Sequence, residues 1–208
     1  MTSMKKTHPG RLRRRLACKA LALPLPLALV AVAGVGAAPR ARADRGEPAS
    51  GSLALERRVK AAFLYKFLGY AEFPPQAFAD AAGPLTIVVV GSDDMAAELA
   101  RIASGRAIVG RPILVRALRE HEQVPAAHLL FVAGNDGERA GRVLRAAQGA
   151  WLTVTECDGG LRAGSVINFR IVDERVRFDV SLDAAERKNV KLSSRLLTVA
   201  NRVQKGGT

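Results

Sequence analysis

The sequence predicts a single α/β domain built on a mainly parallel sheet flanked by helices, with a C-terminal antiparallel hairpin and a final helix. Three observations lead to this fold. The apolar, largely β-branched run Leu85–Val90 is typical of a strand buried on both faces. Strand-like and helix-like segments then alternate along the chain, as in β-α-β units. The last third changes to an alternation of apolar and polar residues, which indicates strands with one covered face.

Residues 1–43 have the pattern of a secretory signal peptide. They hold nine of the chain's 32 Lys and Arg and no acidic residue, and their basic part precedes an uncharged run at Ala20–Pro39. The run leads to Ala41-Arg42-Ala43, a small-x-small pattern that signal peptidase accepts. The alternative is an uncleaved anchor, since a run of this length could just span a bilayer. Prolines and glycines inside the run disfavour the anchor, so we expect export to the periplasm with cleavage near Ala43.

The rest of the chain has the composition of one folded domain. Its net charge is +4, against +13 for the whole chain, and no basic stripe is present, which excludes a basic nucleic-acid binder. Apolar residues make up 49% of the chain, which excludes a disordered protein. Cys157 is the single cysteine after residue 43, so no internal disulfide is expected. We expect a flexible leader at 44–52, the α/β domain at 53–204 and a disordered tail at 205–208.

Periodicity places the elements of this domain. A helix is predicted at Leu53–Tyr70, where Phe63 and Phe67 share one stripe and apolar residues on further sides indicate two covering surfaces. Ser92 or the following aspartate can cap a helix that runs to about Ala103. The other expected elements are strands at Ile113–Leu118, His128–Ala133 and Trp151–Thr155, and helices at Gly137–Gln148 and about Leu192–Val203.

The hairpin consists of Val166–Val172 and Arg175–Leu182, joined tightly by Asp173-Glu174. Alternation gives it one apolar and one polar face. A charged sheet face is usually solvated, but arginine is also enriched at protein interfaces, so a partner-binding role stays open. The residues of the polar face are Asn168, Arg170, Arg175, Arg177 and Asp179.

No catalytic, metal or cofactor motif stands out. The turn after the first strand, Gly91–Asp94, has neither a phosphate loop nor a dinucleotide fingerprint and fits a capped helix start. The spacing of His121 and His128 matches no metal-ligand motif. Ser92 lacks the flanking glycines of a nucleophile elbow, and acidic neighbours raise the pKa of Cys157, the wrong direction for a nucleophile. We therefore expect a protein that is not an enzyme and carries no metal or cofactor.

Several segments in order resemble the YfiR-like family. The similarity extends over Leu53–Val203, and the order and spacing of the segments are more specific than any one of them. The hairpin turn Asp173-Glu174 departs from the family, in which a glycine is frequent, and the single Cys157 cannot form the family's redox-sensing disulfides. The similar segments are Val59–Phe67, Phe73-Pro74, Gly110–Ile113, Gly164–Phe169, Arg175–Val180, Leu182–Ala185 and Leu192–Leu197.

The resemblance implies a periplasmic regulator that binds the periplasmic sensor region of an inner-membrane diguanylate cyclase and represses cyclic-di-GMP synthesis. It also implies a homodimer and sequestration by an OmpA-like outer-membrane lipoprotein. Two alternatives are a periplasmic small-ligand-binding module that feeds a sensor kinase, and a hydrolase with an unrecognised site. The aromatic stripe of the first helix packs in the core or docks a partner, so its residues join the hairpin face as candidates. The partner-binding candidates are Phe63, Tyr65, Phe67, Asn168, Arg175, Arg177 and Asp179.

Overall fold

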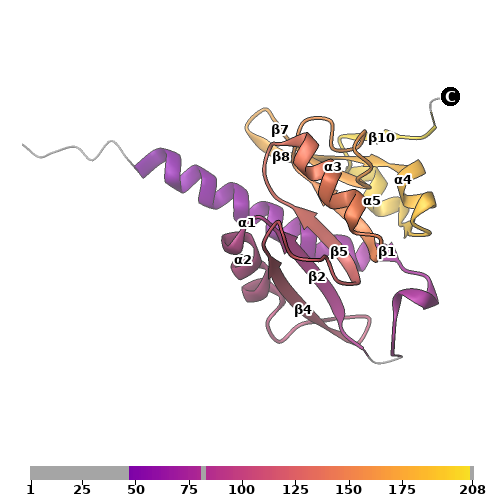
Figure 1. The fold of residues 1–208 in the computed structure, drawn as a ribbon. Coiled ribbons are helices and arrows are strands. Elements are labelled where there is room, and N and C mark those ends of the chain that lie inside the picture. Colours follow the sequence, from indigo (N-terminus) through magenta and orange to yellow (C-terminus); the bar gives the residue numbers. More distant parts are fainter. Residues whose placement is uncertain (1–46, 81–82, 207–208) are drawn as a thin grey trace, which may run out of the picture. The chain divides into compact units, whose positions relative to one another are not determined.

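The structure is a computed structural model that describes residues 47–80 and 83–206. It confirms a mixed α/β fold with a mostly parallel central sheet, flanking helices and a C-terminal antiparallel hairpin (Figure 1). The predicted signal peptide at 1–43 lies outside the described residues. A flexible leader was expected at 44–52. In the structure the first helix already begins at Glu47 and includes residues 47–52.

One large sheet runs through the described part of the chain. Its strands are β2 (Leu85–Val90), β3 (Ala107–Ile108), β4 (Arg111–Leu118), β5 (Ala127–Val132), β6 (Ala150–Thr155), β7 (Ile167–Val172), β8 (Arg175–Ser181) and β10 (Arg202–Gln204). Among the described residues the strand order is β10-β8-β7-β6-β5-β2-β4-β3. The pairs β2–β4, β2–β5, β5–β6, β6–β7 and β8–β10 are parallel, whereas β7–β8 and β3–β4 are antiparallel. The predicted mainly parallel sheet is therefore confirmed.

Helices cover both faces of the sheet. They are α1 (Glu47–Tyr70), α2 (Asp93–Ala103), α3 (Gly137–Ala146), α4 (Leu182–Arg187) and α5 (Ser194–Val199). α1 and α2 lie on one face and α3 on the other (Figure 1). A short 3-10 turn at Pro75–Ala77 and a small antiparallel pair of β1 (Ala71–Glu72) with β9 (Lys191–Leu192) lie beside the main sheet.

The side chains of β2 show why this strand reads as a continuous apolar run. Ile87 and Val89 point into the core under α1 and α2, whereas Val88 and Val90 point into the second core under α3. Because successive side chains alternate between the faces, a strand with helices on both sides needs apolar residues throughout. The prediction of a strand buried on both faces is confirmed.

α1 is packed on more than one side, as its apolar residues predict. It contacts α2 along one side and β8 and α5 along another. Leu64, Phe67 and Leu68 are at most 2% exposed. Phe67 lies at the centre of an aromatic cluster, with ring centroids 5.0 Å from Phe178 and 5.8 Å from Phe169. This cluster fastens α1 to the inner face of the hairpin.

The hairpin forms with the expected strands. Asp173 and Glu174 adopt φ of 49° and 58° between the two strands. A two-residue turn with both φ positive is of type I′, whose twist matches that of antiparallel strands. Aspartate tolerates this region better than most residues, so the absence of glycine leaves the predicted pairing intact.

The predicted last helix is present as α5, but it is shorter at both ends than the expected range of about Leu192–Val203. Leu192 belongs to β9, Ser193 caps α5 through its Oγ, and the helix ends at Val199. Asn201 then donates its backbone N–H to the Phe178 carbonyl at 2.8 Å, and Arg202–Gln204 pair with β8. Hydrogen bonding to an open sheet edge thus outweighs the helical spacing of the apolar residues. The short helix α4, β3 and β10 were not predicted.

Candidate partner-binding and ligand-binding surfaces

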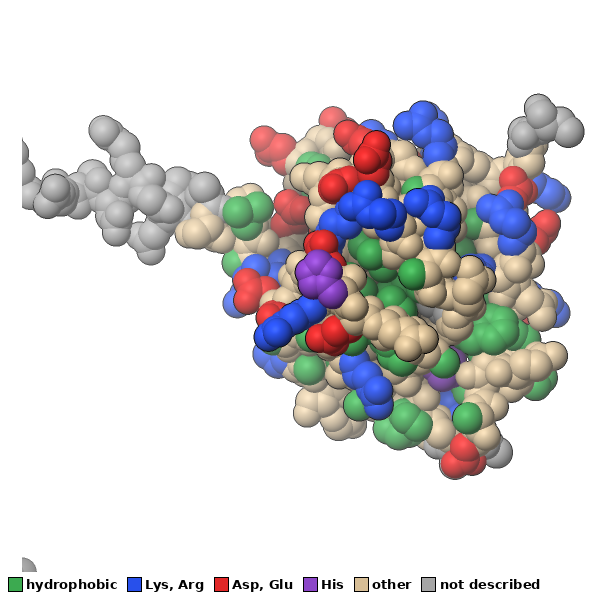
Figure 2. All heavy atoms as spheres, viewed as in Figure 1, with side chains coloured by type: hydrophobic (Ala, Val, Ile, Leu, Met, Phe, Trp, Pro, Cys, Tyr) green, Lys and Arg blue, Asp and Glu red, His purple; other side chains and the backbone are tan. Residues whose placement is uncertain are grey.

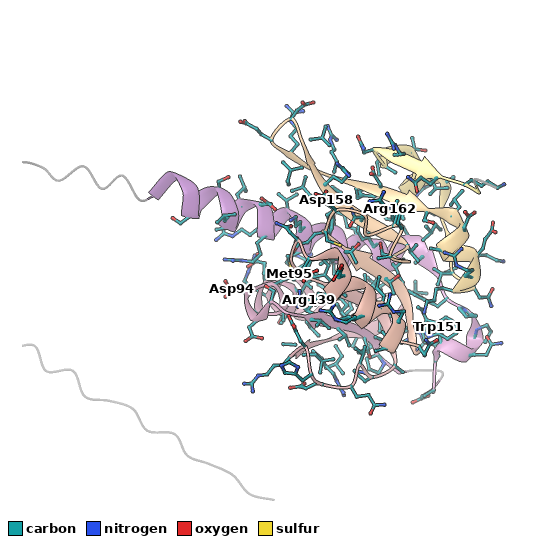
Figure 3. All side chains as sticks on the ribbon, turned by 45° about the horizontal axis from the view of Figure 1, so that its top comes forward. Asp94, Met95, Arg139, Trp151, Asp158 and Arg162 are labelled. Carbon is teal, nitrogen blue, oxygen red and sulfur yellow. The ribbon has the colours of Figure 1, made fainter. Side chains whose placement is uncertain are left out.

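In an open parallel sheet, ligands bind where neighbouring strands send their chain to opposite faces, at the carboxyl ends of those strands. Here that place lies between β2, which leads into α2, and β5, which leads into α3. The protein's own side chains fill it. Arg139 of α3 donates to the Ala133 carbonyl at 2.5 Å and pairs with Glu120 (Figure 3). A Cβ at Gly91 would overlap the Arg139 guanidinium, so the glycine makes room for this side chain.

An ion-pair network around the buried Lys60 lies at the same edge of the sheet. Lys60 Nζ of α1 lies 2.6 Å from Glu156 Oε2 and 2.5 Å from Glu56 Oε1, and Glu156 Oε1 accepts the Gly134 backbone N–H at 2.6 Å. Burial disfavours the charged ammonium, but hydrogen bonds and charge attraction from the two glutamates outweigh it and raise the pKa of Lys60. The network therefore ties α1 to the ends of the strands.

Ser92 and the two aspartates after it have structural positions. The Ser92 Oγ accepts the Met95 backbone N–H at 3.2 Å, which confirms a capped helix start (Figure 3 labels Asp94 and Met95 there). Asp94 pairs with Arg57 of α1 at 2.9 Å. Within residues 47–80 and 83–206, no three His, Cys, Asp or Glu side chains are placed to hold a metal ion.

Cys157 and His128 are both buried. Cys157 is a free thiol, 2% exposed; burial first, and then the charges of Asp158 and Glu156, raise its pKa, as the sequence predicts. His128 is 7% exposed, and its Nδ1 accepts the Thr86 backbone N–H at 3.0 Å. Burial, reinforced by the charge of Arg111, lowers the pKa of His128 below its usual 6.5.

The lowered pKa of His128 predicts a pH-dependent stability. The unfolded chain takes up a proton near pH 6.5, before the folded one does, so stability is full above that pH and falls as the pH drops below it. We expect the free energy of unfolding in urea to decrease between pH 7.5 and pH 5, with a smaller decrease in His128→Leu. An equal pH dependence in both proteins would contradict this assignment.

Three of the seven candidate residues for partner binding are buried. Phe67 is fully buried in the aromatic cluster, whereas Asn168 and Asp179 are 4% and 7% exposed. The polar face of the hairpin is thus covered at Asn168 and Asp179. The loop at 159–164 covers Asn168, and Asn201 Nδ2 donates to Asp179 Oδ1 at 2.7 Å.

The exposed candidates lie on two separate surfaces. Arg175 and Arg177 are exposed on β8, and Phe63 is half-buried beside them against Phe178, at a centroid distance of 5.5 Å. Tyr65 points away from the hairpin, since its ring lies 5.6 Å from the Arg106 guanidinium. The structure therefore groups Phe63 with Arg177 and separates Tyr65 from them.

A shallow apolar cavity of about 300 Å³ lies on the first of these surfaces, between α1, β8 and α5. The phenyl rings of Phe63 and Phe178 line its inside, and Arg177 and Lys66 supply charges at its edge. Val199, 60% exposed, and Tyr70, 37% exposed, extend the apolar surface. Sequence periodicity could not find this cavity, because it is formed by α1, β8 and α5, which are separate segments of the chain.

A basic surface lies on α3, which covers the face of the sheet opposite to α1. The arginines of α3 are spaced three residues apart, at 139, 142 and 145, and Figure 2 shows Lys and Arg side chains gathered over this helix. Arg139 is engaged in the contacts described above, and Arg142 and Arg145 are exposed.

These observations define an α/β domain in which the protein's own side chains fill the crevice at the strand ends. The cavity described here lies elsewhere, between α1, β8 and α5. The chain belongs to the YfiR/HmsC-like family, whose sequence model matches residues 57–201. A comparison with curated proteins gave no match. No helix among the described residues combines the length and the apolar character needed to cross a bilayer.

Proposed function

We propose that this chain is a periplasmic, non-enzymatic regulator that binds the periplasmic region of an inner-membrane diguanylate cyclase and represses cyclic-di-GMP synthesis. The observation that carries the proposal is the family match over residues 57–201, which begins within α1 and continues to the end of α5. The signal-peptide pattern at 1–43 and the filled crevice at the strand ends support it. A regulator of this kind must bind one state of its partner more tightly than the other, since equal affinity shifts no equilibrium.

We propose the cavity between α1, β8 and α5 as the contact surface. Its apolar floor, with Phe63 and Phe178, suits an apolar side chain of the partner, and Arg177 at its edge suits a carboxylate. Arg175 lies next along the exposed end of β8. The family also leads us to propose a homodimer, and an OmpA-like outer-membrane lipoprotein that competes for the same surface.

A second candidate function uses the same cavity. A space of about 300 Å³ with an aromatic lining also suits a small apolar ligand, which favours a ligand-binding sensory module. Such a ligand would raise the melting temperature of the purified protein, and the rise would grow with the logarithm of the ligand concentration relative to its Kd. The regulator needs no such ligand for its binding to the cyclase.

Arg177→Ala tests the contact surface. Because Arg177 is exposed and forms no ion pair among the described residues, we expect its loss to change the unfolding free energy by no more than about 0.5 kcal/mol. We expect it to weaken binding of the cyclase's periplasmic region about tenfold or more, as a contact worth over about 1.4 kcal/mol would. Calorimetric binding and thermal unfolding of the same preparations give both values.

Two further variants make this test specific. Arg116→Ala removes an exposed arginine from β4, near the other edge of the sheet, and should change neither quantity. Tyr65→Ala tests the separate surface beside Arg106. If Arg177→Ala and Arg116→Ala bind equally well, the cavity is not the contact surface; if Tyr65→Ala alone loses binding, the surface beside Arg106 replaces it.

The function itself is tested in cells. Deletion of the gene should raise intracellular cyclic-di-GMP, and the full-length gene should restore the low level. A gene lacking codons 1–43 should fail to restore it, because the protein then stays in the cytoplasm. Unchanged cyclic-di-GMP on deletion, where the protein is normally produced, would overturn the proposal and leave the ligand-binding module.

A further inference from the structure

An arginine-lined cavity lies on the polar side of the C-terminal strands, apart from the apolar cavity described above. Its volume is about 220 Å³, and it is an open cavity lined by the loop after β6 together with β7, β8 and β10. Arg162 comes from the loop, Arg170 from β7 and Arg202 from β10, so three separate segments each contribute one guanidinium (Figure 3 labels Arg162).

The protein does not neutralise these three arginines. Within residues 47–80 and 83–206, none of them forms an ion pair or a side-chain hydrogen bond. Asp179 is the acidic residue in the lining, and its Oδ1 is already bound by Asn201 Nδ2. The lining therefore carries a formal charge of +2, from three arginines and one aspartate. No acidic side chain among the described residues pairs with these arginines.

The hairpin register increases the positive charge at this place. Arg170 lies directly opposite Arg177 in the antiparallel pair β7–β8. Like charges at directly opposite positions destabilise a sheet, so this arrangement is unfavourable unless something negative lies between them. An anion held at the cavity would relieve the repulsion among all four arginines.

The base of the cavity is fixed by buried polar contacts. Asn168 is 4% exposed, and its Oδ1 is 2.6 Å from Thr155 Oγ1, which is in turn 2.9 Å from Ser165 Oγ. The backbone at Gly160 lies so close to this group that a Cβ there would overlap Thr155 and Asn168. The loop that carries Arg162 is thus held at a defined position, which reduces the entropy lost when a ligand binds.

We propose that this cavity binds a small phosphate monoester that also carries a hydroxyl group. Planar guanidinium groups match the oxygens of a phosphate in paired hydrogen bonds, and a phosphate monoester of charge about −2 near pH 7 balances the net charge of the lining. The carboxylate of Asp179 supplies an acceptor for the hydroxyl. The proposal does not rest on binding of the cyclase, since the residues that line this cavity differ from those that line the apolar cavity.

The test uses the purified protein with glycerol 3-phosphate as the probe. At constant ionic strength, calorimetry should show saturable binding at one site, and the melting temperature should rise with probe concentration. Arg170→Gln and Arg202→Gln should each weaken binding about tenfold or more. The matched control Arg116→Gln, an exposed arginine on β4, should bind as the unchanged protein does.

Several outcomes would overturn the proposal. They are the absence of saturable binding, an equal melting shift with added chloride, and an equal loss in Arg116→Gln. Binding of inorganic phosphate as tight as that of the probe would assign the site to free phosphate instead of an ester, and binding of succinate alone would assign it to carboxylates. Circular dichroism of each variant shows whether it is folded, and Arg162→Gln replaces any variant that is not.

Discussion

Phe67→Ala is expected to lower the free energy of unfolding by about 3–5 kcal/mol, as removal of a fully buried phenyl ring does in other cores. Phe67 has no exposed surface, and its ring contacts those of Phe63, Phe169 and Phe178 at centroid distances of 5.0–5.9 Å. Alanine would leave a cavity where α1 meets the hairpin. Because small domains are stable by only about 5–15 kcal/mol, the variant should unfold at markedly lower urea concentration.

The matched control is Tyr70→Ala, one turn further along α1. Tyr70 is 37% exposed, so the loss should be about 1 kcal/mol or less. Urea titrations of both variants, followed by circular dichroism, give the comparison. Similar midpoints for Phe67→Ala and Tyr70→Ala would show that the aromatic cluster does not hold α1 on the sheet.

Much of the fold could be predicted because its strands carry strong local patterns. Leu85–Val90 has the predicted bounds, since a strand between two helical layers needs an unbroken apolar run. The helix Asp93–Ala103 also matches, because Ser92 caps it as the sequence indicates. The hairpin was predictable from alternation together with a two-residue turn. These signals are local, so one sequence suffices to read them.

The C-terminal segment shows where local signals fail. Leu192, Leu196, Val199 and Val203 have helical spacing, yet only Leu196 and Val199 lie in α5. The hydrogen bonds of Arg202–Gln204 to β8 depend on an open edge that another part of the chain provides. Periodicity contains no information about such a distant partner, so the prediction of one helix was wrong there.

The candidate surfaces were predictable only in part. Alternation correctly placed Arg175 and Arg177 on the polar side of the hairpin, but burial of Asn168 and Asp179 depends on the loop after β6 and on Asn201. The arginine cavity was missed because Arg162 and Arg202 come from segments without a recognised pattern. Paired glycines at 159 and 160 were the available signal of a close backbone approach.

Gly160→Ala is the second substitution for which we expect a large effect. It tests directly how closely the backbone at Gly160 approaches Thr155 and Asn168. A methyl group at residue 160 would overlap Thr155 Oγ1 and Asn168 Oδ1 and lie 2.9 Å from Asn168 Cγ. Both side chains are buried and hydrogen-bonded, so neither can move away freely. Overpacking costs about 1–3 kcal/mol, and a buried polar group left without its partner costs about 1–3 kcal/mol more.

The control for this variant is Gly69→Ala in α1, where an added Cβ meets no atom within 4 Å. Alanine favours a helix over glycine, so this variant should be more stable by up to about 1 kcal/mol. Urea unfolding should therefore shift in opposite directions for the two substitutions. If Gly160→Ala unfolds at the same urea concentration as the unchanged protein, the loop is not held against Asn168. The base of the arginine cavity would then not be preorganised for an anion.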